Sequence, residues 1–377
     1  MRIVESGYIH DGRSAAPHQR SCARTAVVEM RDGTLIASCR LGSARQSVDG
    51  HEAVFASADA GRTWELRHHG YGQGAWEDGT PGEVFSFTVA ETSPGLLTAT
   101  GIWMDRSNPE LPMVNPATQG FLPMRMFHTT SADGGFTWGP RRRMDTRPHK
   151  AASSATQGVW PLPGGLLAQP YEWWKEYDDP SPGRPGCCFR VSRDGGLTWP
   201  EYLPVARHPD NLLYYWDIRL AAHPESGRWV AMFWTHEPAA GVDRDVHVSW
   251  GAPDARSWTT PEGTGLPGQH CDPVPLGGDR LMAVYSHRAD PPGIAASLSG
   301  DFGRTWDRSR DLMVYDSSAG TEPGARGPRS QKEKFSDMEA WRFGHPRGEL
   351  LRDGSVLVVF YAGGDDAKSA CWAKVEP

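Results

Sequence analysis

The chain has 377 residues, a length that closed all-β folds commonly reach as a single domain. Its 43 Gly, 31 Pro, 16 Trp, 12 Phe and 10 Tyr suit many short strands and turns rather than long helices. The formal net charge of −7 argues against a sequence-independent affinity for nucleic acid, which depends on clustered Lys and Arg.

The six cysteines are scattered, and no two of them have the CxxC spacing of a zinc site built on paired cysteines. We expect them to be small buried apolar side chains, the usual environment of a free Cys. The N-terminal segment has no apolar core of a secretion signal, and no apolar stretch reaches the length of a membrane span. These features predict a cytoplasmic protein with reduced thiols and no membrane partner.

A first internal repeat has the pattern Ser-x-Asp-x-Gly-x-Thr-Trp. Its four copies begin at Ser57, Ser131, Ser192 and Ser299, and a decayed fifth copy spans 251–258. The pattern predicts a hairpin turn, because an Asp side chain accepts hydrogen bonds from nearby backbone N–H groups and Gly adopts positive φ. The Thr then returns the chain to a strand, and the Trp packs between neighbouring sheets. We therefore expect the Asp of each copy to be structural.

A second repeat sets the expected number of units. Six times, a Gly-containing turn separates two short apolar segments, and the second segment ends in polar or aromatic residues. The first segments of the six pairs are 25–30, 84–89, 159–162, 218–222, 273–276 and 347–351. Each pair predicts the two inner strands of a four-stranded antiparallel blade of about 40 to 50 residues plus loops. The fold prediction is one all-β domain over residues 1–377, a six-bladed β-propeller.

The first repeat is an Asp-box, and on this motif the chain resembles the sialidase superfamily of propellers. In that family the boxes lie on the rim, away from the active site. Arg24 matches the family's arginine at the start of the first inner strand, and Ser38-Cys39-Arg40 resembles the Gly-Arg that ends the next.

Other family positions differ in this chain. The tyrosine nucleophile falls on His345, and its partner glutamate falls near Asp217. The position of the acid falls on His51, beside Asp49 and Glu52. The second and third arginines of the carboxylate-binding triad have no match, although Arg288 and Arg347 are near in register. The resemblance therefore implies a sialidase-like fold without a reason to expect sialic acid.

The ends of the inner strands nominate a set of residues for the central mouth of the ring. Aromatic faces stack on sugars, and arginines bind carboxylates through two hydrogen bonds. The candidate catalytic residues are His345, Asp217, His51, Glu237 and Tyr361. The candidate substrate-binding residues are Arg24, Arg40, His287, Arg288, Tyr171, Trp173, Trp103 and His270.

Three functions fit such a mouth, each with an oligosaccharide or glycoside as partner. The first is an exo-glycosidase that cleaves the terminal glycosidic bond of an acidic sugar. Two carboxyl groups would flank that bond. Asp217 and Glu237 lie on one pair of inner strands, and Asp49 or Glu52 would face them.

The second function is a uronate lyase that works by β-elimination, which needs a cation, a base and an acid. Arg24 or Arg288 would neutralise the uronate carboxylate. One of His345, His51 and His287 would be the base, because imidazole titrates near neutral pH. Tyr361 or Tyr171 would be the acid. The third function is a carbohydrate-binding propeller without catalysis.

No cofactor is expected, and no spacing motif predicts a metal. Three of the histidines His51, His236, His270, His287 and His345 could still hold a divalent ion if they met near the axis. Three long connections, 104–125, 171–180 and 317–337, are candidates for specificity loops. The alternative for the second connection is a dimer contact through Trp173 and Trp174.

Overall fold

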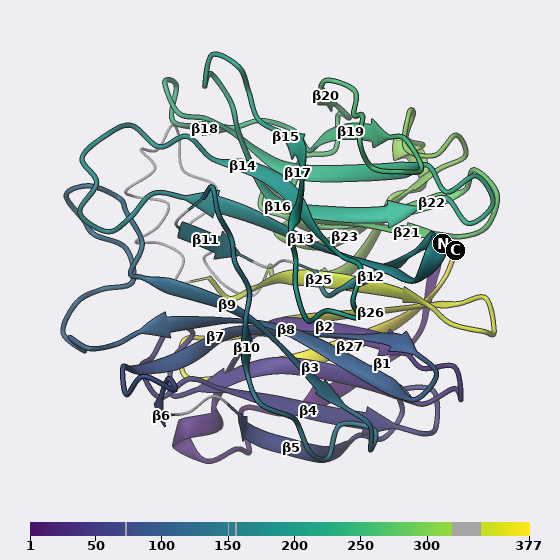
Figure 1. Ribbon diagram of the computed structural model, residues 1–377. Helices are drawn as coiled ribbons and strands as arrows, with labels where there is room; N and C mark the ends of the chain where they lie inside the picture. Colours follow the sequence, from purple (N-terminus) through teal and green to yellow (C-terminus); the bar gives the residue numbers. More distant parts are fainter. Residues whose placement is uncertain (72–73, 150, 155–156, 319–340) are drawn as a thin grey trace.

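The computed structural model describes residues 1–71, 74–149, 151–154, 157–318 and 341–377, and these are almost entirely β-structure (Figure 1). In the described part of the chain, three short 3-10 helices interrupt the strands: η1 (Pro17–Gln19), η2 (Pro163–Gly165) and η3 (Arg308–Arg310). Within the described ranges, no helix has the length and apolar character that crossing a membrane would require.

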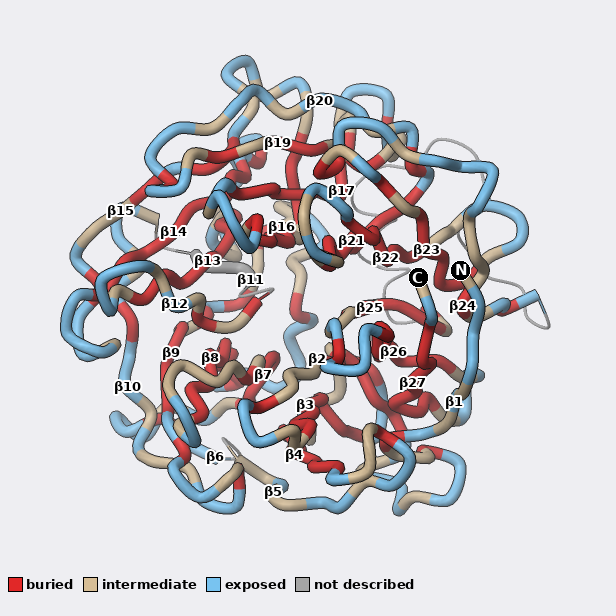
Figure 2. Tube along the Cα trace, turned by 90° about the vertical axis from the view of Figure 1, so that its right-hand side faces the viewer, coloured by how far each residue is buried: buried red, intermediate tan, exposed pale blue. Residues whose placement is uncertain are grey.

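Antiparallel strand pairs are arranged around a common centre (Figure 2). All six predicted inner pairs form, each across a short turn. They are β2 (Ser21–Glu29) with β3 (Leu35–Gly42), β7 (Pro81–Ser93) with β8 (Leu96–Asp105), β12 (Trp160–Leu162) with β13 (Leu166–Trp174), β16 (Tyr214–Ala222) with β17 (Trp229–Glu237), β21 (Gly268–Pro275) with β22 (Leu281–His287), and β25 (Phe343–Leu350) with β26 (Val356–Gly363).

Most of the remaining strands extend these pairs outward from the centre, whereas β6 (Gly74–Ala75) and β11 (Ala151–Ser154) pair with β7 and β13 on their inner side. The others are β1 (Arg2–His10), β4 (His51–Ser57), β5 (Glu65–Tyr71), β9 (Met124–Ser131), β10 (Arg142–Arg143), β14 (Gly186–Ser192), β15 (Glu201–Ala206), β18 (Val242–Asp243), β19 (His247–Gly251), β20 (Glu262–Gly263), β23 (Gly293–Ser299), β24 (Leu312–Asp316) and β27 (Lys368–Glu376). The second strands are buried along nearly their whole length, because sheets pack against both of their faces.

The described strands form five hydrogen-bonded sheets, so the prediction of six separate blades is not confirmed. One sheet has eight strands, in which β25–β27 and β2–β5 are joined by a single parallel bridge between Ser21 and Lys368. The strand β1 also belongs to this sheet, where it pairs with β27. The two ends of the chain therefore lie side by side, as Figure 2 shows, and hydrogen bonds between them close the ring.

The Ser-x-Asp-x-Gly-x-Thr-Trp segments form tight turns between the third and fourth strands. In the first copy, Asp59 accepts hydrogen bonds from the backbone N–H of Thr63 at 2.9 Å and from its hydroxyl at 2.6 Å. Gly61 has a φ of +92° and donates its N–H to the Ser57 hydroxyl. The Asp residues of the other three copies make the same bonds. These carboxylates are used within their own turns, which is the structural role expected of them.

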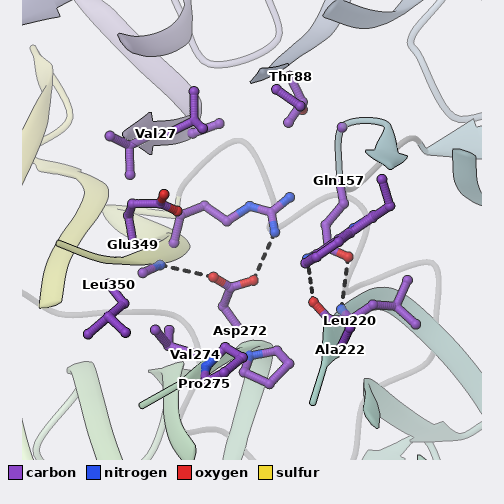
Figure 3. A pocket seen from close by; sticks show the side chains of 18 of the residues that line it. Val27, Thr88, Gln157, Leu220, Ala222, Asp272, Val274, Pro275, Glu349 and Leu350 are labelled. Atoms are coloured by element: carbon purple, nitrogen blue, oxygen red, sulfur yellow. Dashed lines mark hydrogen bonds and ion pairs between the residues drawn. The ribbon is translucent and has the colours of Figure 1, made fainter. Parts of the chain in front are cut away.

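A cavity of about 540 Å³ lies near the axis, on the side of the ring where the first strand of each inner pair ends (Figure 3). Valines line much of it, but polar groups cross it from sheet to sheet. Asp272 of β21 accepts a hydrogen bond from Arg347 of β25 at 2.8 Å and another from the backbone N–H of Gly348 at 2.9 Å. Gln157 binds the N–H of Leu220 at 2.8 Å and its carbonyl at 3.0 Å. Side chains of one sheet thus hold the inner backbone of the next.

Glu349 lines the same cavity, and its substitution gives a testable stability change. Burial raises the pKa of Glu349 to about 7, with smaller contributions from Asp272 and Glu29. Because the pKa in the folded protein exceeds the ordinary 4.5, the contribution of Glu349 to stability is full below pH 4.5, falls as pH rises, and is lost above pH 7. We expect Glu349→Gln to stabilise the protein at pH 8 by about 2–3 kcal/mol, and hardly at pH 4.5. Thermal unfolding at both pH values, with the exposed-site variant Asp279→Asn as control, measures this. An equal Tm change at both pH values would contradict it.

Candidate functional site

Five inner strands carry a bulge at the same place, and in four of them the bulge holds a non-glycine residue in the left-handed region. The φ angles are +54° at Arg24, +48° at Asp217, +44° at His270 and +49° at His345. Each residue lies at a register shift between the first and second strands of its pair. A bulge bends the strand and re-aims a side chain, and such backbone strain, about 1–3 kcal/mol a residue, gathers at functional sites. The repeated bulge therefore marks the candidate site.

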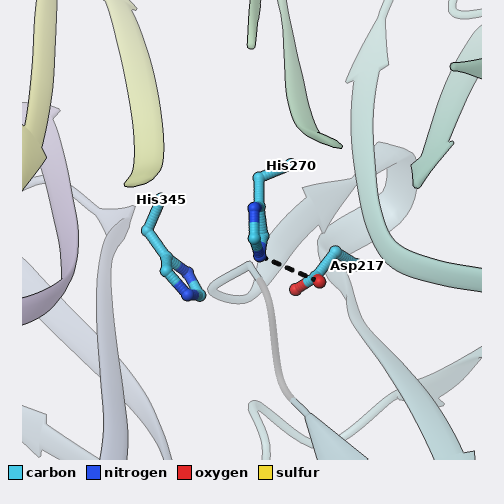
Figure 4. A group of neighbouring side chains, drawn as sticks. All are labelled: Asp217, His270 and His345. Carbon is cyan, nitrogen blue, oxygen red and sulfur yellow. Dashed lines mark ion pairs between the residues drawn. The ribbon is translucent and has the colours of Figure 1, made fainter. Parts of the chain in front are cut away.

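Three of these side chains meet at the axis, as Figure 4 shows. The Oδ2 atom of Asp217 lies 3.1 Å from Nε2 of His270. The rings of His270 and His345 have centroids 4.3 Å apart and planes inclined by 37°. His270 is buried, whereas the Asp217 side chain retains 13% exposure. A carboxylate and two imidazoles from three different sheets thus form one contact group.

The charge state of this group follows from its surroundings. Burial by itself raises the pKa of Asp217, but His270, Arg219 and Arg24 outweigh it and lower the pKa below its ordinary value. Burial, the neighbouring His270 and the Arg45 guanidinium lower the pKa of His345 well below 6.5. Near neutral pH, Asp217 is therefore a carboxylate and His345 a neutral imidazole.

Arg24 adds a buried cation to the site. Its guanidinium carbon lies 3.5 Å from the centroid of the Phe85 ring, and Phe85 occupies the corresponding bulge of β7. The Nη1 atom is buried and has no hydrogen-bond partner among the described residues. Burial lowers the pKa of Arg24, and the nearby cations Arg45 and Arg40 lower it further. A buried guanidinium in this state is favourable only with an anion beside it.

Two buried carboxyl groups stand behind this centre. Both carboxyl oxygens of Glu52 are buried without a hydrogen-bond partner among the described residues, and burial raises its pKa well above 4.5. Glu52 is paired in register with Arg40 across β3 and β4. Glu172 of β13 accepts the backbone N–H of Asp217 at 2.6 Å. Burial and the charge of Asp217 raise the pKa of Glu172 well above 4.5, so protonation is favoured at both Glu52 and Glu172 relative to a carboxyl group in water.

The sequence reasoning missed Arg45. This residue lies in the connection between β3 and β4, yet its side chain is fully buried. Its Nε donates a hydrogen bond to the Tyr361 hydroxyl at 3.2 Å, and its Nη2 lies 3.3 Å from Nε2 of His345. The repeats identify the ends of strands, and Arg45 lies in a loop between strands, so the repeats gave no indication that it reaches the site.

The structure brings together five of the predicted residues, namely Arg24, Asp217, His270, His345 and Tyr361. Arg288 lies next to them, with its guanidinium carbon 4.4 Å from the Trp341 ring centroid and its Nε donating to Gln269 at 3.2 Å. Its charge also lowers the pKa of His270, after burial.

The three aromatic residues that the sequence nominated for stacking on a sugar are buried in packing contacts instead. Trp103 has no exposed surface and packs against Trp76 at a centroid distance of 5.4 Å. Tyr171 is fully buried and donates its hydroxyl to the Thr146 carbonyl at 2.9 Å. Trp173 stacks on His149 at 3.6 Å. All three lie on second strands, and their side chains enter the packing between sheets, unlike Tyr361 of the second strand β26.

Four further predicted residues lie outside the contact group. His51 is buried and points its Nδ1 at the Asp49 carbonyl, 3.3 Å away. Arg40 is buried in an ion pair with Glu83. The last two have partners near the rim: Glu237 pairs with Arg244, and His287 bonds to the Pro291 carbonyl at 2.9 Å.

The long connections 104–125 and 171–180 pack on each other. A parallel bridge joins Phe121 to Glu176, and Asn115 donates a side-chain hydrogen bond to the Tyr177 carbonyl at 3.0 Å. Trp174 is 6% exposed, so it and Trp173 are not the exposed dimer contact that the sequence suggested. The third predicted connection, 317–337, lies outside the described residues from 319 onward.

The contact group of Asp217, His270 and His345 could also be considered as a metal site. Asp217, His270 and His345 offer a carboxylate and two imidazole nitrogens, a donor set that zinc uses. Their ligand atoms lie within 4.8 Å of one another, and Asp217 Oδ2 is 3.1 Å from His270 Nε2, a separation that a metal ion could bridge. The Arg45 guanidinium, 3.3 Å from His345, nevertheless repels a dication. The residues present therefore suit an anion better than a metal ion.

The chain matches no family model and no curated protein. Solved structures do match it. A protein of unknown function from Dyadobacter fermentans shares 17% identity at a TM-score of 0.72, over 100% of this chain and 98% of that one. The Hadza microbial sialidase Hz136 shares 15% identity at 0.67, over 98% and 68%. An α-L-arabinanase from Penicillium chrysogenum shares 12% identity at 0.60, over 100% and 99%. These similarities establish an all-β, propeller-like fold that glycoside hydrolases also have.

The positive charge of Arg45 beside His345 predicts that metal ions do not change the stability of the protein. We expect neither EDTA nor added Zn²⁺ to shift the Tm of the protein purified without an affinity tag, because a ligand stabilises only a state that binds it. Thermal unfolding with and without each reagent, together with elemental analysis, measures this. A rise in Tm with Zn²⁺ that His345→Ala abolishes would overturn the argument.

Proposed function

We propose that this protein is a carbohydrate-active enzyme that cleaves a terminal glycosidic bond of an acidic sugar. One observation carries the proposal: equivalent bulges bring Arg24, Asp217, His270 and His345 to one buried site, where a guanidinium nitrogen has no partner among the described residues. The fold is shared with proteins named as sialidases, an arabinanase and an arabinofuranosidase, which supports glycoside hydrolysis.

We further propose that the ring has six blades. The eight-stranded sheet divides at its single parallel bridge into β2–β5 and into β25–β27 with β1, four strands on each side. Each part has its own bulged inner strand, at Arg24 and at His345. The inner strands of the six blades then surround one substrate site.

The anionic group of the sugar binds the cationic side of the site. Arg24 and Arg45 face the contact group from the first sheet, and each has a buried Nη1 without a partner in the described part of the chain. A carboxylate placed between them accepts charge-assisted hydrogen bonds, which are about twice as strong as neutral ones.

Two carboxyl groups in opposite protonation states supply the chemistry. Glu52, kept neutral by burial, protonates the leaving oxygen. Asp217 is ionised and assists water or attacks the anomeric carbon, while His270 orients its carboxylate. This division into one acid and one base is what glycoside hydrolysis needs.

The second candidate function is β-elimination at a uronic acid. The neutral imidazole of His345 favours it, because a neutral imidazole can abstract the C5 proton. Tyr361, in contact with Arg45, would protonate the leaving oxygen, and Arg24 would neutralise the uronate.

The protein is further proposed to work in the cytoplasm. All six cysteines are free and buried, as the sequence predicted. Free thiols suit a reducing compartment.

Matched aryl glycosides that differ only in a C6 carboxylate test the proposed substrate class. We expect the wild-type protein to cleave the glucuronide with a kcat/KM at least about tenfold above that of the glucoside, in one anomeric series. Asp217→Asn should lower kcat by about 10²-fold or more on both substrates, since it removes the base. Asp279→Asn, an exposed change on a distant turn, should leave kcat unaltered. Unchanged turnover in Asp217→Asn would remove Asp217 from the mechanism.

The product separates hydrolysis from elimination. With an oligosaccharide of 4-linked uronic acids, in which a terminal bond can be hydrolysed and a group on C4 can be eliminated, we expect new reducing ends and no unsaturated product that absorbs in the ultraviolet. An increase in ultraviolet absorbance that matches the new reducing ends would replace the hydrolytic proposal with the lyase. Binding of uronate-terminated oligosaccharide without either product would leave a carbohydrate-binding propeller.

A further inference from the structure

The loop of residues 43–50, between β3 and β4, is held by a single side chain. The guanidinium of Arg40 donates hydrogen bonds to the backbone carbonyls of Arg45 at 2.9 Å and Ser47 at 2.5 Å, and a longer one to Ala44 at 3.4 Å. Asp49 adds bonds inside the loop, where it accepts the Ser43 N–H at 3.1 Å. Three carbonyls on one buried guanidinium fix the path of the loop.

Arg40 is itself held from the neighbouring sheet. Its Nη2 donates to Oε2 of Glu83 on β7 at 2.5 Å. The other oxygen of Glu83 accepts Nε of Arg106 at 2.8 Å and its Nη2 at 2.5 Å. Arg106 also reaches the Gln46 carbonyl at 3.4 Å, so the loop is bonded from two sides. One carboxylate thus pairs with two guanidiniums, and the three buried groups define a single arrangement.

The loop backbone passes very close to Arg40. A Cβ atom at Gly50 would lie 1.8 Å from Nη2 of Arg40, which no real contact allows. Glycine is therefore required at position 50 for Arg40 to keep its place.

The tip of the loop delivers Arg45 to the candidate site. Its Nε and Nη2 contact Tyr361 and His345, and its guanidinium carbon lies 5.3 Å from the Trp341 ring centroid. The Nη1 atom is buried and has no hydrogen-bond partner among the described residues. The side chain is thus oriented on three sides, and one donor atom is left for a ligand.

We propose that Arg45 binds the anionic group of the substrate and sets the preference for acidic sugars, and that Arg40 is the positioning residue that holds it there. This inference rests on the proposed function and adds a substrate-binding residue that comes from outside the repeated strands. A purely structural Arg45 would need an acid beside it, since an unpaired buried charge costs several kcal/mol. Its contacts among the described residues are instead a phenol, an imidazole and two aromatic faces. A side chain held in its bound geometry loses little entropy when an anion arrives.

The Arg45→Met variant, which keeps an unbranched apolar stem and removes the guanidinium, tests the binding role. We expect KM for the aryl glucuronide to rise about 10- to 100-fold, while KM for the matched glucoside changes less than about threefold. Added guanidinium ion should restore part of the glucuronide preference in Arg45→Ala. An equal loss on both glycosides, or no loss, would overturn the proposal.

The Gly50→Ala variant tests the positioning role, because it displaces Arg40 and leaves both arginines in the chain. We expect it to weaken the glucuronide preference in the same direction as Arg45→Met, without rescue by guanidinium. Asp279→Asn is the control for both variants, and Tm values show whether each is folded. A folded Gly50→Ala protein with the wild-type preference would remove Arg40 from the positioning role.

Calorimetry with D-glucuronate and D-glucose separates this inference from the proposed function. Wild-type binding of glucuronate that Arg45→Met loses supports the Arg45 role, even if no glycoside is cleaved and the enzymatic proposal fails. Glycoside cleavage with an unaltered preference in Arg45→Met overturns the Arg45 role alone. No glucuronate binding and no cleavage by the wild-type protein overturn both.

Discussion

The structure depends on hydrogen bonds that hold the inner backbone of one sheet to side chains of the next. Glu172 accepts the N–H of Asp217 from the neighbouring sheet. Asp272 does the same for Gly348 on the cavity side. Within the eight-stranded sheet, Thr25 of β2 donates its hydroxyl to the carbonyl of His345 of β25 at 3.0 Å. Left-handed φ angles at non-glycine residues are unfavourable by themselves and persist only where their surroundings hold them. The closed ring supplies those surroundings, so the geometry of the site is a property of the whole circle of sheets.

The electrostatics of the site follow from burial more than from composition. The chain is acidic overall, yet its centre is rich in arginine. Burial raises the pKa of Glu52 and of Glu172, whereas Glu83 is paired with Arg40 and Arg106 away from Arg24 and Arg45. Asp217 stays ionised because His270 and two arginines outweigh its desolvation. The result is a cationic centre with one carboxylate, an arrangement that suits an anionic ligand better than a metal ion.

Most of the nominated residues divide according to the strand on which they lie, and Tyr361, which reaches the site from a second strand, is an exception. Residues at the start of first strands, such as Arg24, Asp217, His270 and His345, reach the axis because each occupies the bulge. Residues on second strands were expected there too, but Trp103 lies in the packing between sheets. Spacing along the sequence identifies the end of a strand, but it does not distinguish a side chain that faces the axis from one that faces the adjoining sheet. The number of hydrogen-bonded sheets was beyond the sequence for a similar reason, since one bridge between chain ends joins two groups of strands.

The sequence alone determined the local structure: the Ser-x-Asp-x-Gly-x-Thr-Trp turns, the six inner strand pairs and the free buried cysteines. These features depend on residues close in the chain or on apolar periodicity, and a single sequence displays both. The tertiary structure decided which polar groups meet, how they ionise, and that Arg45 joins them from a loop. Those outcomes depend on ring closure, which places Arg45 beside His345 across 300 positions of sequence. Contacts of that range leave no spacing pattern, and the burial that shifts each pKa exists only once all the sheets are in place.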